Sequence, residues 1–195
     1  GIYAKLPGDM PEKLALAVLD VAGAPAQTAR LVKPGGTVLI IGGGGKSGLL
    51  CLHEAKKRAG ITGNVIALDF ADSAVDRIRK LGCANAIIQA DARDSIGVMK
   101  RVQETTAGLL ADVTINCVDI PGTEMASILA TKDGGTVYFF SMATSFTAAA
   151  LGAEGVGKDV DMLIGNGYCQ GHSEIAINCL RENAVLHSIF ASVYA

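Results

Sequence analysis

Tryptophan is absent from this chain of 195 residues, and aromatic residues together make up only 5% of it. Charged residues are also scarce at 18%, whereas half of the chain is apolar. A chain of this length and composition has enough apolar side chains to bury a core of its own, which excludes an intrinsically disordered protein. The 24 glycines suit one α/β domain in which short turns join many strands and helices.

Long runs of one charge or of apolar residues are also lacking. The formal net charge is −2, and no basic stretch is long enough to hold nucleic acid or an anionic membrane, so we expect neither as a partner. The first residues carry no signal-peptide pattern. The longest stretch without a charge, residues 134–153, contains five Ser or Thr and three Gly, which makes a poor membrane-spanning helix.

The five cysteines form no CxxC pair, and the three histidines show no metal-ligand spacing with one another or with cysteine. We therefore expect free thiols, a reducing and hence cytoplasmic location, and no metal site. These residues are Cys51, Cys83, Cys117, Cys169 and Cys179, and His53, His172 and His187.

Short runs rich in β-branched residues alternate along the chain with segments of helical spacing. The predicted strands are 37–41, 64–69, 86–89, 112–117, 135–140 and 159–164. The predicted helices are 46–59, 73–81, 93–105, 122–130 and 173–182, preceded by two short helices over 10–32, the second opened by Pro25. For residues 184–193 the pattern leaves strand and helix open.

This alternation predicts right-handed βαβ units and therefore an α/β fold with a parallel sheet. Six strands fit a doubly wound Rossmann sheet of strand order 3-2-1-4-5-6 with helices on both faces. We expect residues 1–33 to form a helical lead-in that packs on this sheet, and residues 34–195 to form the Rossmann domain.

A run of four glycines joins the first predicted strand to the following helix. Gly43, Gly45 and Gly48 form G-x-G-x-x-G, with a register uncertain by one residue. In such a motif the first Gly permits a tight turn, the second lets a pyrophosphate approach the backbone, and the third lets helix and strand pack closely. The helix start adds unpaired N–H groups, and Lys46 and Ser47 add a cation and a hydroxyl.

This turn has two other possible interpretations. Gly45-Lys46-Ser47 looks like the end of a P-loop, but that motif needs a Gly at position 40, where the chain has Ile40. A glycine-rich turn that binds nothing is the remaining alternative.

Asp69 ends the second predicted strand, 21 residues beyond Gly48. A carboxylate at this place accepts hydrogen bonds from the adenosine ribose and repels a 2′-phosphate, so it favours NAD over NADP. The alternative is that Asp69 merely caps the following turn. Phe70 is a candidate to line the adenine pocket, although an ordinary core aromatic fits as well. A Rossmann-like S-adenosylmethionine methyltransferase also has a Gly-rich turn and such an acid, but it usually carries a further acid near the end of the first strand, where this chain has Leu39, Ile40 and Ile41.

Four stretches of the chain resemble the medium-chain dehydrogenase/reductase superfamily. Residues 32–50 look like that family's linker, first strand and glycine turn, and residues 81–84 look like its "LGA" helix ending. Residues 112–118 are similar to its fourth strand, and residues 133–137 to the approach to its fifth. Within the family, residues 44–51 and 164–169 are similar to NAD-dependent enzymes that oxidatively deaminate a 3,5-diamino acid in lysine fermentation.

The resemblance implies a set of cofactor contacts. The glycine turn and the second strand end supply Gly43, Gly45, Lys46, Ser47, Gly48, Asp69 and Phe70, and the later strand ends supply Cys117, Val118, Ser141 and Met142 beside the nicotinamide half. Ligands of open α/β sheets lie beyond the carboxyl ends of the strands, which supports the later set independently. Simple strand-end packing is the alternative for Cys117 and Ser141.

The family carries its catalytic and substrate-binding residues, with zinc where present, largely on an N-terminal barrel-like domain that these residues do not contain. We therefore expect a fragment, or a domain that works beside another chain, and we assign no catalytic residue. A non-catalytic NAD-binding regulatory module remains an alternative. The resemblance also implies a homo-oligomer paired through the strand 159–164. Asn166, Tyr168 and His172 form a polar cluster that either reaches a small-molecule substrate or is an ordinary loop before a helix.

Overall fold

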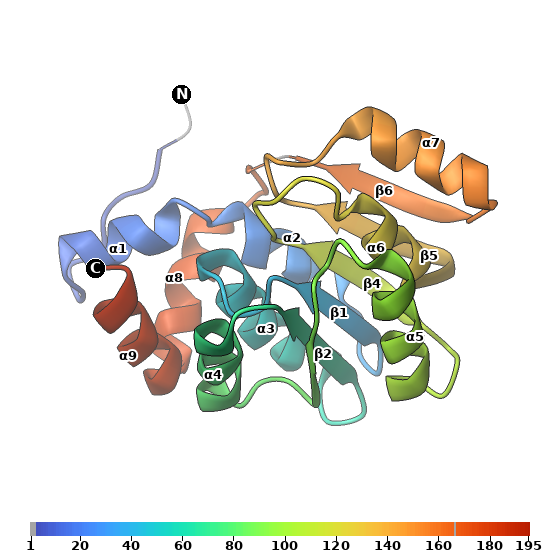
Figure 1. Ribbon diagram of the computed structural model, residues 1–195. Helices are drawn as coiled ribbons and strands as arrows, with labels where there is room; N and C mark the ends of the chain where they lie inside the picture. The colour runs from blue at the N-terminus through green and yellow to red at the C-terminus, as the bar shows by residue number, and fades with distance from the viewer. Residues whose placement is uncertain (1–2, 166) are drawn as a thin grey trace.

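The computed structural model describes residues 3–165 and 167–195, and these residues form an α/β domain around one parallel sheet (Figure 1). Its six strands lie in the order β3-β2-β1-β4-β5-β6, so the predicted doubly wound topology is confirmed. The strands are β1 (Thr37–Ile41), β2 (Asn64–Asp69), β3 (Ala86–Gln89), β4 (Ala111–Asn116), β5 (Thr131–Phe139) and β6 (Val160–Ile164).

Helices cover both faces of the sheet. The first face carries α1 (Glu12–Leu19), α2 (Gly23–Leu31), α3 (Lys46–Ala59), α4 (Asp72–Leu81), α8 (His172–Glu182) and α9 (Ala184–Val193). The second carries α5 (Ser95–Thr105), α6 (Glu124–Leu129) and α7 (Phe146–Val156).

The central strand shows why the sheet is buried on both sides. In β1, Val38 and Ile40 pack against the helices of the first face, while Leu39 and Ile41 pack against those of the second. Because successive side chains of a strand point to opposite faces, a parallel strand covered on both sides has a continuous apolar run. Helix α1 contributes Leu14 and helix α2 contributes Ala24 to the core of the first face.

One helix was missed in the sequence. Helix α7 lies in the stretch interpreted only as uncharged and hydroxyl-rich, and it covers β5 and β6 on the second face. Its start is fixed by Ser145, whose hydroxyl accepts a hydrogen bond from the amide of Ala148 at 3.2 Å. Gly152 and Gly155 within the helix lower its intrinsic helical preference, which hid the pattern.

Several element bounds also differ from expectation: strand β4 ends at Asn116 rather than at 117, helix α5 begins at Ser95 rather than at 93, and helix α6 begins at Glu124 rather than at 122. Residues 184–193, left open, form the helix α9, because the side chain of Asn183 caps the amides of Val185 and Leu186. Strand β5 begins at Thr131, ahead of a register shift opposite Ala111. Helix α2 begins at Gly23, two residues before Pro25, which occupies the first turn where its missing N–H costs no hydrogen bond.

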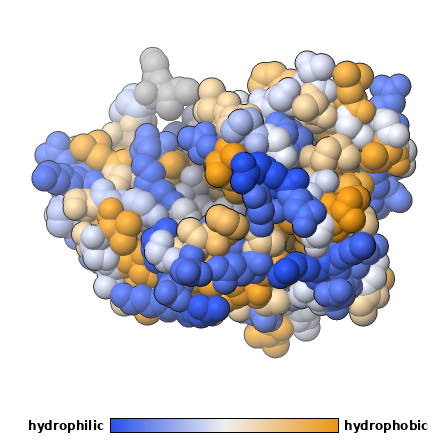
Figure 2. Space-filling model, in the orientation of Figure 1, coloured by the Kyte–Doolittle hydropathy of each residue, from blue (hydrophilic) through white to orange (hydrophobic). Residues whose placement is uncertain are grey.

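On the face drawn in Figure 2, hydrophilic and hydrophobic residues are intermixed, and a hollow lies near the middle, between the region of α1 and α2 and that of β6 and α7. Among the described residues, none of the helices is both long enough and apolar enough to cross a bilayer.

Candidate functional site

The glycine-rich turn between β1 and α3 folds back on the neighbouring strand. The amides of Gly42 and Gly43 both donate to the carbonyl oxygen of Leu68, at 2.8 and 3.0 Å, and the amide of Gly45 donates to the carbonyl of Gly42 at 3.2 Å. Gly42 has a φ of +79°, a conformation that favours glycine. The left-handed residue of the turn is therefore Gly42, one position before the Gly43 to which the motif assigned the tight turn.

Two further glycines of the turn leave no room for a side chain. A Cβ on Gly48 would lie 2.0 Å from the carbonyl oxygen of Gly42, and a Cβ on Gly44 would lie 2.3 Å from that of Ala74. Gly48 thus provides the close approach of helix α3 to the turn that the motif predicts. Gly44, which occupies a free position of the motif, is equally constrained because α4 packs against it.

The first turn of α3 presents unpaired amides. Its first backbone hydrogen bond runs from Leu49 to the carbonyl of Gly45, and among the described residues the amides of Lys46, Ser47 and Gly48 have no acceptor. With the positive end of the helix dipole, these amides suit an anion. The ammonium group of Lys46, the first residue of α3, forms an ion pair with Asp20 at 2.5 Å.

Asp69, at the end of β2, is tied to the same turn. One carboxylate oxygen accepts a hydrogen bond from the amide of Gly44 at 2.9 Å, and the other accepts one from the amide of Phe70 at 2.8 Å. The carbonyl of Gly44 in turn accepts from Nε of Arg77 at 2.8 Å. Each carboxylate oxygen can accept two bonds or more, so Asp69 has capacity for a further donor.

A small apolar cavity of about 90 Å³ lies beside Asp69. Phe70 lines it with 67% of its surface exposed, so Phe70 is not a core aromatic. At its edge Arg93 forms an ion pair with Asp91 at 2.6 Å, and the hydrogen bonds from Arg93 lower the pKa of that carboxyl to about 2. The cavity is lined by Leu68, Asp69, Phe70, Ala90, Asp91, Ala92, Arg93, Val118, Ile120 and Thr123.

A second cleft, of about 440 Å³, lies over the ends of β4 and β5. Of the predicted strand-end residues, Cys117, Ser141 and Met142 line this cleft, whereas Val118 lines the smaller cavity instead. Ser47 also lines the cleft, so the start of α3 borders it. The structure thus divides the predicted residues into a group around Asp69 and a group around Cys117.

The thiol of Cys117 lies 4.0 Å from that of Cys51 on α3. The contact with Cys51 and burial both raise the pKa of Cys117 well above its ordinary value, so Cys117 is a neutral thiol at neutral pH. The five cysteines are free, as expected.

The polar cluster proposed after β6 is only partly described. Tyr168 and His172 have ring centroids 5.1 Å apart in an edge-to-face contact, whereas Asn166 lies outside the described residues. The amide of His172 donates to the carbonyl of Cys169 at 2.9 Å and so opens α8. This arrangement is that of a loop leading into a helix.

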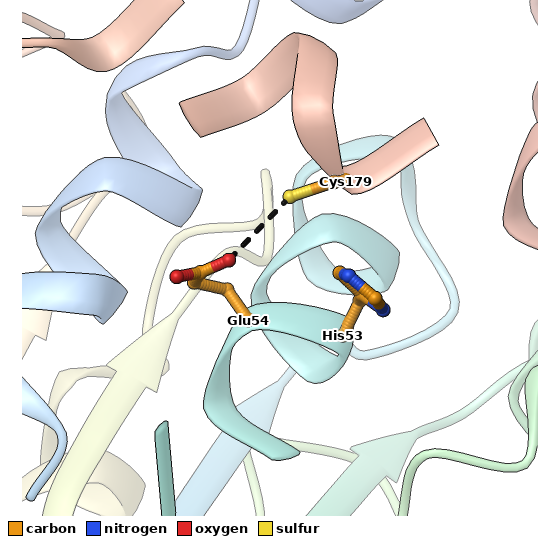
Figure 3. A group of neighbouring side chains, drawn as sticks. All are labelled: His53, Glu54 and Cys179. Carbon is orange, nitrogen blue, oxygen red and sulfur yellow. Dashed lines mark hydrogen bonds between the residues drawn. The ribbon is translucent and has the colours of Figure 1, made fainter. Parts of the chain in front are cut away.

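His53, Glu54 and Cys179 offer possible metal-ligand atoms that lie within 4.8 Å of one another (Figure 3), a group that the spacing of these residues does not reveal. Each already has a protein partner: Glu54 pairs with Arg58 at 2.7 Å and lies 3.8 Å from Cys179, and His53 contacts Glu182 at 3.1 Å. His53 and Glu54 are adjacent on α3 and leave it in different directions. We interpret the group as a polar contact between α3 and α8.

Two curated relatives match the whole chain. It is 56% identical over 194 residues to L-erythro-3,5-diaminohexanoate dehydrogenase of Acetoanaerobium sticklandii and 53% identical over 194 residues to the enzyme of that name from Fusobacterium nucleatum. The chain spans 56% of the length of each relative, or about half.

Among solved structures, an alcohol dehydrogenase from Thermotoga maritima superimposes with a TM-score of 0.68 at 19% identity, over 92% of this chain and 50% of that one. At this identity the likeness concerns the fold. No family model matches the chain. The resemblance of this chain to the L-erythro-3,5-diaminohexanoate dehydrogenases is confirmed by the two relatives, and its fold is that of the dinucleotide-binding half of solved alcohol dehydrogenases.

Proposed function

We propose that this chain is the NAD-binding part of an oxidoreductase. One observation carries the proposal. The glycine turn leads directly into the three unpaired amides at the start of α3, and the same turn is hydrogen-bonded to the carboxylate of Asp69. The amides and Lys46 hold the pyrophosphate, since they offer donors and positive charge. Asp69 accepts the hydroxyls of the adenosine ribose, and the small cavity beside Phe70 takes the adenine.

The charge of Asp69 sets the choice between the two dinucleotides. Its carboxylate lies where the ribose 2′ position is expected, and a 2′-phosphate there would meet a negative charge. NAD is therefore the preferred ligand. Arg77, which donates to Gly44, is the cation on the same side that a 2′-phosphate would otherwise use.

The nicotinamide half occupies the larger cleft, where Ser47, Cys117, Ser141 and Met142 surround it. Nicotinamide supplies the hydride chemistry, and the protein orients the ring and shields it from water. The two relatives are named L-erythro-3,5-diaminohexanoate dehydrogenase. We propose that the whole protein acts on this substrate by oxidative deamination, as a step in lysine degradation. We assign no acid or base to this chain. We propose that the substrate is bound jointly by this chain and by a further part of the protein, which corresponds to the portion of the relatives that these 195 residues do not match.

Residues 1–33 serve as a helical lead-in and residues 34–195 as the dinucleotide-binding unit. We place the protein in the cytoplasm, which its five free thiols support. The exposed edge of β6 is the surface through which we expect two copies to pair.

Titration of the purified chain with NADH, NADPH and S-adenosylmethionine, followed by fluorescence or calorimetry, tests the proposal. We expect saturable binding of NADH, weaker binding of NADPH, and none of S-adenosylmethionine. Binding of S-adenosylmethionine alone would identify a methyltransferase and end the proposal.

Turnover is tested on a protein of the relatives' full length that contains this chain. Reduction of NAD with 3,5-diaminohexanoate is the expected result. NADH binding without turnover of this or related amino acids would identify a non-catalytic NAD-binding module.

A further inference from the structure

A further cleft, of about 560 Å³, lies where α2 and the end of α3 meet the loop that leads into α8. It shares no lining residue with the two cavities that we assign to the dinucleotide. Its walls are accessible to solvent, since Arg30 is exposed, the side chain of Arg58 is 41% exposed and Tyr168 is 45% exposed. A small solute can therefore enter this cleft.

Two arginines line the cleft, and no acidic residue of the described chain lines it with them. The Nε of Arg58 donates to the buried carboxylate of Glu54 at 2.7 Å, which leaves the two terminal amino groups of Arg58 without an acceptor among the described residues. The guanidinium of Arg30 has no acceptor in that part of the chain either. Guanidinium groups bind anions through paired N–H donors, so the cleft suits a small anion.

Gln27 of α2 also lines the cleft, and it is only 4% exposed. Its Oε1 is, among the described residues, the one buried side-chain nitrogen or oxygen atom without a hydrogen-bond partner. The amide nitrogen of Gln27 has no protein acceptor in the same part of the chain, and it is not among the buried atoms, so it keeps access to the cleft. A buried amide without partners is costly, and a ligand that bonds to both of its ends would remove that cost.

We propose that this cleft binds a small organic acid that carries a hydroxyl or ammonium group beside its carboxylate. Arg30 and Arg58 bind the carboxylate, the amide nitrogen of Gln27 donates to it, and Oε1 of Gln27 accepts the neighbouring O–H or N–H. The donor and the acceptor of one amide lie side by side, so they match such a pair of ligand groups. The last torsion of a glutamine side chain is broad, so a modest turn of the amide brings Oε1 to the surface of the cleft.

The test titrates a protein of the relatives' full length that contains this chain with malate, followed by calorimetry. Malate carries a hydroxyl beside one carboxylate, and its second carboxylate gives each guanidinium a partner. Succinate has the same charge without the hydroxyl, and inorganic phosphate offers an anion alone. We expect saturable binding of malate that is several-fold tighter than that of succinate. Absence of malate binding, or binding no tighter than that of succinate or phosphate, would overturn the proposal.

Three variants sharpen the result. Arg30→Gln should lower the affinity for malate by roughly 10-fold or more, since it removes a charged donor. Gln27→Met should make the affinities for malate and succinate equal. Arg79→Gln is the matched control and should bind malate unchanged, because Arg79 is an exposed arginine of α4 that pairs with Asp76. Equal losses in the two arginine variants, or a preference for malate that survives in Gln27→Met, would contradict the assignment.

Urea denaturation of Gln27→Met gives a readout that does not depend on binding. The substitution removes a buried group that has no partner, so the free energy of unfolding should stay level or rise. A marked loss of stability would show that the amide of Gln27 is satisfied within the fold and is not kept for a ligand.

Saturating NADH separates this site from the dinucleotide site. The affinity for malate should be the same with and without NADH, because the clefts share no lining residue. Competition between malate and NADH would place malate in the dinucleotide site and overturn the assignment. A failure of NADH to bind would count against the proposed function alone, since the titration with malate is made without NADH.

Discussion

Asp69 both holds the glycine turn and faces the proposed ribose. Replacement by Ser should weaken NADH binding by roughly 10- to 100-fold, since a hydrogen bond to a charged acceptor contributes about 1.5–3 kcal/mol. NADPH should lose much less affinity, because the charge that opposes its phosphate is removed and Arg77 remains. Asp76→Asn, which removes an exposed carboxylate of α4 paired with Arg79, is the control. Equal losses for both dinucleotides would show that Asp69 does not face the ribose.

Of the glycines in the turn, Gly48 is the one at which we expect an added methyl group to destabilise the fold most. In Gly48→Ala the added Cβ would lie 2.0 Å from the carbonyl oxygen of Gly42, so α3 must shift away from the turn. We expect a loss of about 1–3 kcal/mol in the free energy of unfolding, measured by urea denaturation, together with weaker NADH binding.

Gly155→Ala is the matched control for that measurement. Nothing lies within 4 Å of the position of its added Cβ, and Gly155 is helical. Its stability should stay level or rise by up to about 0.5–1 kcal/mol. Equal destabilisation by the two substitutions would show that the close contact at Gly48 is not what makes glycine necessary there.

The sequence predicts which residues form this candidate site better than it predicts the contacts that these residues make. Asp69 and Gly48 follow from spacing, because a strand, a turn and a helix impose fixed distances along the chain. The conformation of four successive glycines does not follow, since none of them has a side chain to mark its place, and the left-handed residue is Gly42. The contact of Cys51 with Cys117 depends on how α3 lies over β4, which no local pattern encodes.

At the scale of elements, Asp112 joins the starts of two central strands. Its carboxylate accepts a hydrogen bond from the amide of Thr37 at 2.7 Å and forms an ion pair with Lys132 of β5. Partial burial raises its pKa, but the hydrogen bonds from Lys132 and Thr37 outweigh that effect, so the pKa lies below the ordinary 3.8. This stabilisation is present above about pH 4 and is lost as the pH falls through the folded-state pKa.

Asp112→Asn should therefore destabilise the protein at about pH 7 by about 1 kcal/mol or less, given the exposure of the ion pair. The difference from the unchanged protein should shrink at about pH 3. Urea denaturation at about pH 7 and about pH 3 measures this difference in the free energy of unfolding. Lys132→Met removes the other partner of the same ion pair and should have a similar effect. A difference that grows toward acid would mean that the pKa is raised on folding.

The elements themselves were predictable to different degrees. The six strands follow from short apolar and β-branched runs that alternate with helical segments, and their order follows from the doubly wound fold that this alternation predicts. Helix α7 was not found because its sequence, FTAAALGAEGV, has small residues on most sides and two glycines, so no apolar face stands out. Helix α9 could not be told from a strand by its apolar pattern. Its start is defined by the side chain of Asn183, which caps the helix only when the chain turns at that residue.

At the scale of the whole molecule, β6 forms one of the two edges of the described sheet. Strand β6 pairs only with β5 in the described sheet, and Ile164 at its end is 36% exposed. An unpaired edge offers a row of hydrogen-bonding groups to a second copy. We expect sedimentation experiments to give the mass of a dimer, and a monomer at high micromolar concentration would contradict pairing through this edge.

The glycine turn is secured on three sides by its own protein: by the carbonyl of Leu68, by the carboxylate of Asp69 and by the guanidinium of Arg77. A loop already held in its working shape loses little conformational entropy when a ligand arrives. If the turn holds the dinucleotide phosphates as we propose, we therefore expect binding to need no slow ordering of this loop, and the residence time to depend on the strength of the contacts.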